Sequence, residues 1–263
     1  MKLLQVSSSN QKFKKIDSTR RVYSISLLAG HTCPFAKDCK SSAIMTDSGK
    51  LAIQDGPDTV FRCFSAAQDA QYPETYRARF RNGALLKKEH KENGTVGVAD
   101  LLENSLLKHP RGRIRRADMD SALIRPHVSG DMFSMWYLDA WLILANRYPQ
   151  WRFYFYTKAL PLLMRRMEML PPNVHPIASK GGTHDHLIPS LLATGRVREA
   201  RVVYSALEAA RIGLEVDVDD SLAAFGDKSF ALLIHSTQPK GSRASLAVAA
   251  LKREKRAALK GMR

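Results

Sequence analysis

Residues 123–158 read LIRPHVSGDMFSMWYLDAWLILANRYPQWRFYFYTK and contain one complete strand–helix–strand unit. The apolar run at 123–128 predicts a buried strand, and apolar residues at helical spacing predict a helix over 134–147. The following RFYFY predicts a second strand over 152–156. Because two strands joined by a crossover helix run parallel in one sheet, this stretch predicts an α/β protein built on a parallel sheet.

The same alternation extends in both directions from this unit. Toward the carboxyl terminus we predict helices over 160–170 and 206–212, and strands over 174–178, 200–204, around Val216 and over 230–234. Toward the amino terminus we predict a strand over 23–28 and helices over 66–86 and 99–108. About six strands separated by helices favour a partial or complete (β/α) barrel as the fold.

The composition is typical of one globular domain followed by a basic tail. We expect a single α/β domain over residues 1–240, in which a loop-rich, cysteine-bearing segment at 24–66 precedes the βα core at 120–238. Residues 241–263 predict a C-terminal helix that is apolar early and basic late. No apolar run is long enough for a membrane span, and the first residues lack the apolar core of an export signal. We therefore predict a cytoplasmic protein without a membrane partner.

The net charge of +16, from 41 Lys and Arg against 25 Asp and Glu, favours nucleic acid or another polyanion as a partner. Two segments concentrate this charge. One is the RGRIRR run between Arg111 and Arg116, and the other is the stretch 240–263, which holds eight basic residues and one acid, Glu254. A general solubility bias with a solvated helix end is the alternative interpretation.

Polar and ionisable residues follow nearly every predicted strand, which is where ligands gather in parallel α/β folds. A site assembled from several such loops is therefore expected at the carboxyl ends of the strands. Its predicted lining is Ser129, Gly130, Asp131, Lys158, Lys180, His184, His186, Asp219 and His235.

The three cysteines, Cys33, Cys39 and Cys63, fall within 31 residues and none occurs elsewhere. Thiolates are soft ligands that favour iron–sulfur clusters or zinc, and zinc would need a fourth ligand, for which His31 is nearest. The polar loop HTCPFAKDCKSS is unlike a core strand, which favours a metal or cluster site over ordinary buried cysteines.

The chain resembles the "gene product 88" family of phage and mobile-element proteins. The resemblance is carried by SLLAGHTCPFAKDCKSSA, GPDTVFRCFSAAQDA, IRPHVSGDMFSMWYLDAWL, FYFYTKALPLL, ASKGGTHDHLI, RVVYS, DVDDSLAA and FALLIHSTQPKGS, in this order over residues 24–250. Cysteines on a β/α scaffold are also similar to radical S-adenosylmethionine enzymes, whose three-cysteine [4Fe–4S] cluster reductively cleaves that cofactor.

This second resemblance implies a radical-SAM-like partial barrel in which Cys33, Cys39 and Cys63 hold a [4Fe–4S] cluster with one open iron. It also implies S-adenosylmethionine as a cofactor. The turn at 129–131 is similar to the superfamily's Gly-Gly-Glu turn, which gives Asp131 the role of amino-group acceptor. The cysteine spacing departs from the usual CxxxCxxC loop, because the first gap is longer and the third cysteine is distant in sequence.

Three functional hypotheses follow. The leading one is a phage-type iron–sulfur protein of the host cytoplasm that, if an enzyme, acts on a nucleotide or nucleic acid. The second is a non-catalytic nucleic-acid-binding protein with a structural cluster or zinc ion. The third is a metal-dependent nuclease or hydrolase built on His184, His186 and the acidic loop from Asp217 to Asp220.

Overall fold

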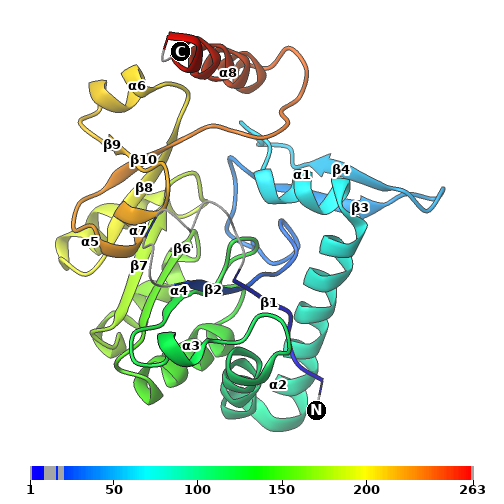
Figure 1. The fold of residues 1–263 in the computed structure, drawn as a ribbon, viewed down its shortest axis with the longest axis vertical. Coiled ribbons are helices and arrows are strands. Elements are labelled where there is room, and N and C mark those ends of the chain that lie inside the picture. The colour runs from blue at the N-terminus through cyan, green and yellow to red at the C-terminus, as the bar shows by residue number, and fades with distance from the viewer. Residues whose placement is uncertain (1, 9–15, 17–20, 262–263) are drawn as a thin grey trace.

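The computed structural model describes residues 2–8, 16 and 21–261 and is organised around one sheet of eight strands (Figure 1). The strand order is β1-β2-β5-β6-β7-β8-β10-β9, and every neighbouring pair is parallel except β1 with β2. The strands are β1 (Val6–Ser7), β2 (Val22–Ile25), β5 (Leu123–Arg125), β6 (Arg152–Thr157), β7 (Val174–Ser179), β8 (Arg198–Val203), β9 (Glu215–Val216) and β10 (Phe230–Leu233).

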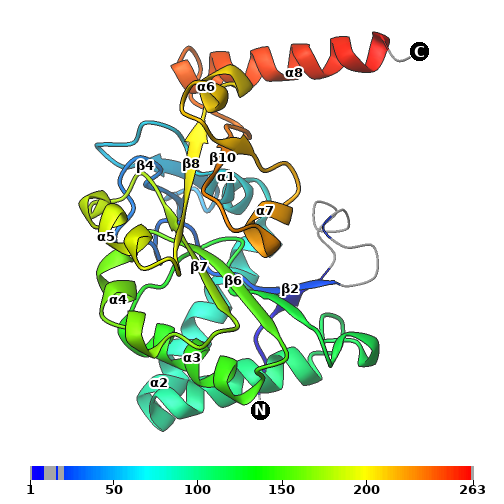
Figure 2. The same cartoon turned by 90° about the vertical axis from the view of Figure 1, so that its left-hand side faces the viewer.

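The predicted α/β class with a parallel sheet is confirmed, and β2, β5, β6, β7 and β8 stand in the sheet in chain order (Figure 2). Two details differ from the prediction. The last strand, β10, lies between β8 and β9, and the short β1 adds an antiparallel edge. The order ends at β1 and β9, and no strand pairing within the described residues joins these two edges. The described strands therefore form an open sheet and not a complete barrel.

Helices cover one face of this sheet and enclose the larger core. The alternation of side chains along β6 sends Phe153 and Phe155 to this face, where they join buried residues of α2 (Pro73–Lys108), α3 (Met135–Arg147), α4 (Leu160–Met164) and α5 (Ile188–Ala193). Burying each such aromatic or aliphatic side chain contributes about 1.5–3 kcal/mol. This layer holds more buried apolar residues than the opposite face of the sheet.

The opposite face of the sheet packs against a short helix, α7 (Ser221–Phe225), near the amino ends of the strands. The first residues of β6 and β8 hold it there. Arg152 Nε donates to the carbonyl of Ala224 at 2.5 Å, and Arg198 donates to the carbonyls of Leu222 and Ala223 at 2.5 and 2.7 Å. Because α7 occupies the amino-end side of this face, the carboxyl ends of the strands are left to the loops.

The helices of the amino-terminal half differ from their predicted bounds. The predicted helix over 66–86 is divided into α1 (Phe64–Gln71) and the start of α2, because Tyr72 is extended and Pro73 begins a new helix. Helix α2 then continues through the polar stretch after residue 86, with a break at Gly94 (φ 67°), and includes the residues of the helix predicted over 99–108. A hairpin of β3 (Ser41–Met45) and β4 (Leu51–Asp55) precedes α1.

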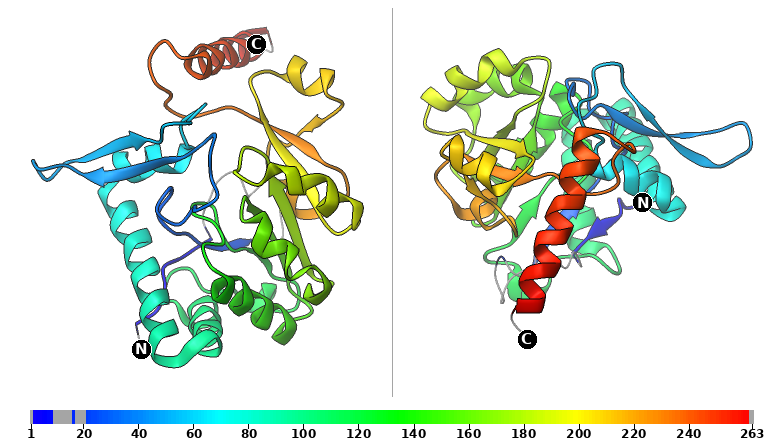
Figure 3. Two further views of the ribbon diagram at one scale, coloured as in Figure 1. Left: turned by 180° about the vertical axis from the view of Figure 1, so that it is seen from behind. Right: turned by 90° about the horizontal axis from the view of Figure 1, so that it is seen from above.

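The carboxyl-terminal half keeps the predicted elements, with bounds that differ by a few residues. The helix predicted over 160–170 is α4 followed by a 3₁₀ turn at Met167–Met169, and the helix at 206–212 is α6 (Ala206–Arg211). The last helix, α8 (Arg243–Gly261), crosses over the rest of the molecule in the view from above (Figure 3). In the part of the chain that the structure describes, none of the helices combines the length and apolar character needed to cross a membrane.

Candidate functional site

The loop that carries Cys33 and Cys39 follows β2 and is fixed to the loop that follows β7. Ala36 forms an isolated antiparallel bridge with Gly182, and the backbone N–H groups of Lys37 and Asp38 both donate to the carbonyl of Gly181, at 3.1 and 3.0 Å. Within the loop, Lys40 Nζ donates to the carbonyls of Gly30 and Cys33. The first two cysteines are therefore held at the carboxyl ends of β2 and β7.

Cys63 reaches the same place from a different segment, directly before α1. Two sets of backbone contacts hold this segment. Arg62 N–H donates to Gln238 Oε1 at 2.7 Å, and Gln238 Nε2 donates back to the Arg62 carbonyl at 3.0 Å. Phe61 N–H donates to the carbonyl of Asp38, the residue before Cys39. The loop after β10 and the cysteine loop after β2 thus jointly position Cys63.

The three free thiols lie close enough to influence one another electrostatically. Burial raises the pKa of Cys33, and the neighbouring Asp131, Cys63 and Cys39 raise it further. Burial, followed by Cys39, raises the pKa of Cys63 to about 11, against the lowering effect of the Ser65 and Ala66 N–H groups and of Lys158. Without a bound cation, the thiols of Cys33 and Cys63 are therefore protonated at neutral pH, and a cation would stabilise their thiolate forms.

Asp131 lies beside Cys33 but its carboxylate is already engaged. It is 5% exposed and accepts hydrogen bonds from Met132 N at 2.7 Å, Thr157 Oγ1 at 2.6 Å and Lys158 N at 2.8 Å. Burial raises its pKa, and these three donors oppose that shift. Asp131 therefore ties the turn at 129–131 to the end of β6, a role that the sequence pattern did not indicate.

Of the predicted lysines and histidines, only Lys158 is buried at the site. Its Nζ donates to Ser179 Oγ at 2.6 Å and to the carbonyls of Ser179 and Lys180, which leaves its charge next to Cys63. Lys180 and His186 are exposed, and the ring of His184 packs edge-on against Phe35 with centroids 5.3 Å apart.

Sequence reasoning missed Asp185, which shapes the loop after β7. Its two carboxylate oxygens accept the N–H groups of Gly181 and Gly182 at 2.9 and 2.8 Å. Gly181 has φ +100°, and a Cβ there would lie 3.0 Å from Asp38. The glycine pair was visible in the sequence, but only the fold shows that it allows the cysteine loop to approach this closely.

The predicted acidic residue Asp219 belongs to a different part of the molecule. In its loop, Asp217 accepts the N–H groups of Asp219, Asp220 and Ala223, which caps α7, and Asp220 forms a buried ion pair with Arg125. These carboxylates therefore position α7 and do not join the cysteines. His235, in contrast, packs on Phe64, the residue after Cys63, with ring centroids 4.9 Å apart.

Among the described residues, no group of three or more His, Cys, Asp or Glu side chains is arranged to hold a single metal ion. The ring of His31 lies 3.0 Å from the carbonyl of Ala43 and is exposed, so it does not complete a zinc site with the thiols. The predicted set of His184, His186 and the acidic loop from Asp217 to Asp220 is not assembled either, because Asp217 caps α7 and Asp220 pairs with Arg125.

In a comparison with known proteins, residues 2–258 match the family model of gene product 88. The chain belongs to the gene product 88 family. This confirms the resemblance to phage gene products, whereas nothing in the comparisons supports the resemblance to radical S-adenosylmethionine proteins. No curated protein and no solved structure matches the chain.

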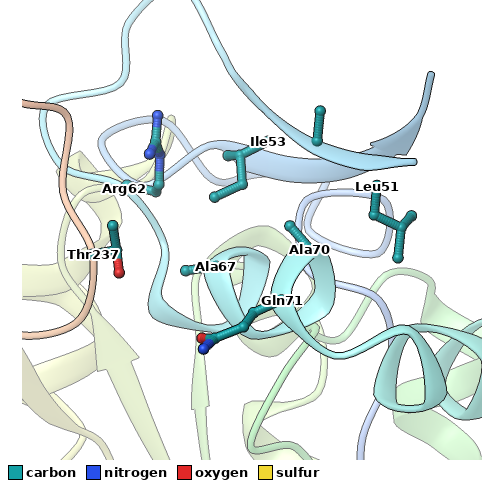
Figure 4. A pocket seen from close by; sticks show the side chains of 8 residues that line it. Leu51, Ile53, Arg62, Ala67, Ala70, Gln71 and Thr237 are labelled. Atoms are coloured by element: carbon teal, nitrogen blue, oxygen red, sulfur yellow. The ribbon is translucent and has the colours of Figure 1, made fainter. Parts of the chain in front are cut away.

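The gene product 88 chain also has a cavity of about 510 Å³ beside the segment that leads to Cys63 (Figure 4). It lies between the β3–β4 hairpin, α1 and the loop after β10, and Arg62 stands at its wall with its guanidinium paired to Asp55 at 2.6 Å. Its lining is Leu51, Ala52, Ile53, Arg62, Ala67, Ala70, Gln71 and Thr237. Small apolar residues line much of this cavity, and its one guanidinium is already neutralised, so it offers little to an anionic ligand.

The two basic segments lie at opposite ends of the gene product 88 sheet. Arg115, from the RGRIRR run, donates its N–H to Tyr23 Oη near the start of β2 and pairs with Asp118. The start of α8 instead packs on Ile234, directly after β10, and on Tyr204, directly after β8. Only the C-terminal segment is therefore on the side of the cysteines.

Replacing Gln238 by leucine is expected to loosen the Cys63 segment of the metal-free protein, because both hydrogen bonds to the Arg62 backbone are lost. Each lost hydrogen bond to a buried group costs about 1–3 kcal/mol. We expect Cys63 to react about tenfold faster with a thiol reagent, measured by mass mapping of the labelled peptide. Thr237→Ala, at the exposed neighbouring position, should leave the rate unchanged. Equal rates in the Gln238→Leu variant and the wild type would refute this positioning role.

Acid should destabilise the protein through His127, which precedes the turn at 129–131. This residue is 3% exposed, and burial followed by the charge of Arg125 lowers its pKa to about 3. Its unfolded-state pKa is about 6.5, so the unfolded chain binds the proton first and stability falls as pH drops from about 6.5 toward 3. At pH 5 the expected loss relative to pH 7.5 is about 2 kcal/mol.

Urea denaturation at the two pH values measures this loss. His127→Gln should reduce the pH dependence, and His186→Gln, at an exposed position, should preserve it. An unchanged pH dependence in His127→Gln would show that other groups control acid stability.

Proposed function

We propose that this gene product 88 chain is an iron–sulfur protein in which Cys33, Cys39 and Cys63 hold a [4Fe–4S] cluster. The observation that carries the proposal is the proximity of the three thiols, seen in the effect of Cys39 on Cys33 and Cys63, on two chain segments held together by backbone hydrogen bonds. No other cysteine is present in the sequence.

The donor set fits a cluster better than a single ion. In a [4Fe–4S] cluster each thiolate binds a different iron, so the three sulfurs stand farther apart than the ligands of one zinc ion. The buried ammonium of Lys158 and the N–H groups that begin α1 favour the negative charge of a thiolate-bound cluster.

The position on the fold supports an open iron that faces a reaction pocket. The cysteines lie at the carboxyl ends of parallel strands, and five of these strands follow one another in chain order. This arrangement supports, as part of the proposal, a radical-SAM-like partial barrel with S-adenosylmethionine as ligand of the open iron. A reduced cluster would supply an electron to cleave that cofactor. Asp131 would hold the turn at 129–131 in place, because its carboxylate already accepts three hydrogen bonds.

The charge of the chain supports a nucleotide or nucleic acid as substrate. The exposed Lys180 follows β7 at the same end of the sheet as the cysteines, and the net charge is +16. Three free thiols in one chain are suited to a reducing compartment, such as the cytoplasm of a phage-infected bacterium.

Anaerobic purification followed by iron, acid-labile sulfide and zinc analysis tests the proposal. We expect a brown protein with four irons and four sulfides per chain. Addition of dithionite and S-adenosylmethionine should then yield 5′-deoxyadenosine. A colourless protein with one equivalent of zinc would contradict the cluster, and an intact, reduced cluster without cofactor cleavage would contradict the radical chemistry.

A second function is favoured by one observation, the exposed basic half of α8. In this alternative the chain binds nucleic acid without turnover, and the cluster is structural. Cluster content together with nucleic-acid binding, but without cofactor cleavage, would be the result that selects it.

A further inference from the structure

Helix α8 consists of two halves with different surroundings. Its first half packs on the body through Ala244 and Val248, which form a buried cluster with Ile234, and Phe61 and Tyr204 pack against this cluster. Arg243 lies over the ring of Tyr204 at 4.3 Å and within 3.8 Å of Glu208. The second half begins at Lys252, and residues 252–257 are all exposed.

The docked half is connected to both cysteine segments. Phe61 stands two residues before Cys63. Burial raises the pKa of Tyr204, the charge of Arg243 lowers it, and the charges of Glu208 and Asp38 raise it. Asp38 directly precedes Cys39. Helix α8 therefore begins next to both cysteine segments, and the view from above shows it running across the molecule toward the C-terminus (Figure 3).

The exposed half presents its charge on one side. At about 100° per residue, Lys252, Arg253, Lys255 and Arg256 lie within an arc of about 160°, and Glu254 lies opposite. The structure gives none of these four basic residues an ion-pair partner among the described residues, whereas Arg243 in the docked half has Glu208. A row of four unpaired cations along one side of a helix suits a phosphate backbone, which also carries a row of charges, better than it suits a single small anion.

The chemistry of α8 selects nucleic acid over a membrane surface. Helices that lie on membranes insert apolar and aromatic side chains. In α8 the buried Ala244 and Val248 and the half-buried Leu251 pack on the body, Leu246 is 64% exposed, and residues 252–257 contain no large apolar residue. Residues 243–263 also contain no aromatic ring on which an unpaired base could stack. Contacts from this helix would therefore go to the backbone, which is continuous and regular in a duplex.

We propose that the exposed half of α8 binds the phosphate backbone of duplex DNA and holds the duplex at the rim of the cysteine site. Duplex DNA would thus be the partner of the proposed cluster site. The placement of the DNA beside a cluster rests on the proposed function. The contacts are independent of base sequence. The DNA affinity should therefore fall steeply as the salt concentration rises.

The test compares the wild type with the variant K252Q/R253Q/K255Q/R256Q, using the full chain and a fluorescent 30-base-pair DNA of arbitrary sequence. The control variant K50Q/K87Q/K88Q/K91Q removes the same four charges at exposed positions elsewhere. We expect the α8 variant to lose about 3–4 from the slope of log K against log salt, and to bind about 10–100-fold more weakly at 0.1 M salt. The slope of the control variant should change by less than a third of the change in the α8 variant.

Three outcomes would overturn the proposal: an α8 variant that binds like the wild type, a control that loses as much, or a preference for anionic phosphatidylserine vesicles over DNA. Iron content and the visible spectrum are measured on the same samples. A variant that keeps its cluster but loses DNA separates this proposal from the cluster proposal. A preparation without iron that still binds DNA through α8 would refute the cluster and leave the α8 contact standing.

Discussion

Replacing Cys63 by serine is expected to reduce the iron content from four per chain to less than one, with loss of the brown colour. A serine hydroxyl is a poor ligand for iron, and two remaining thiolates hold a cluster weakly. The fold should survive, because Cys63 occupies the N-cap of α1 and serine is among the preferred residues at that position. Iron and sulfide analysis on anaerobic protein measures the loss, and circular dichroism checks the fold.

Cys33→Ser and Cys39→Ser should give the same loss, because the three thiolates act as one ligand set. The matched control is His31→Ala, next to the cysteine loop. Its ring lies against the Ala43 carbonyl, so we expect the iron content to stay unchanged. Retention of iron in Cys63→Ser with loss in the other two cysteine variants would show that the third ligand lies elsewhere. Loss of metal in His31→Ala would favour zinc.

The order of the strands could be read from the sequence wherever one helix joins two parallel strands. Residues 123–158 decided the fold, because strand, crossover helix and strand all fall within one apolar pattern, and β5, α3 and β6 occur there. The placement of β10 between β8 and β9 could not be read from the sequence, because the orders β8-β10-β9 and β8-β9-β10 use the same side-chain alternation. The position of β10 in the sheet is decided by packing between segments that are distant in the sequence.

The amino-terminal half was harder to predict because its helix carries few apolar residues. Residues 87–98, KKEHKENGTVGV, have no clear apolar periodicity and contain two glycines, yet α2 runs through them with a break at Gly94. Packing of the later part of α2 on α3 stabilises the helix there, and that contact has no signature in the local sequence.

The candidate site was predictable in its location but only partly in its chemistry. Residues after β2, β6, β7 and β10 do meet, because carboxyl ends of parallel strands share one edge. Three contacts that organise the site have no sequence signature, namely Gln238 with Arg62, Asp185 with the glycine pair, and the binding of Asp131 by backbone and hydroxyl donors. Asp219 lies in the loop that caps α7, and in the sequence such an acidic loop looks like an acidic loop that binds a ligand.

Replacing Arg125 by methionine is expected to lower the free energy of unfolding by about 3–5 kcal/mol. The side chain of Arg125 is 11% exposed and that of its partner Asp220 is 1% exposed, so the variant removes the Arg125 charge from beside a buried carboxylate. The guanidinium also donates to the carbonyl of His127 at 3.0 Å and lies 4.8 Å from the centre of the Tyr156 ring. Urea denaturation at neutral pH measures the change.

The matched control removes an ion pair of the same chemical type at the surface. Arg77 pairs with Glu74, with side chains 70% and 86% exposed, so Arg77→Gln should change stability by no more than about 0.5 kcal/mol. Asp220→Asn gives an independent reading, because asparagine tolerates the left-handed backbone at this position (φ 74°) and the variant removes the negative charge that pairs with Arg125. If both variants of the buried pair lost less than about 1 kcal/mol, the pair would not stabilise the fold.

The same variants link stability to the site. Arg125 ends β5, and its bond to the His127 carbonyl fixes the chain just before the turn at 129–131, which Asp131 connects to β6 beside Cys33. If the ion pair positions this turn, Arg125→Met at a temperature where it remains folded should also speed the reaction of Cys33 with a thiol reagent. Arg77→Gln should leave that rate unchanged, and an unchanged rate in both would confine the role of Arg125 to stability.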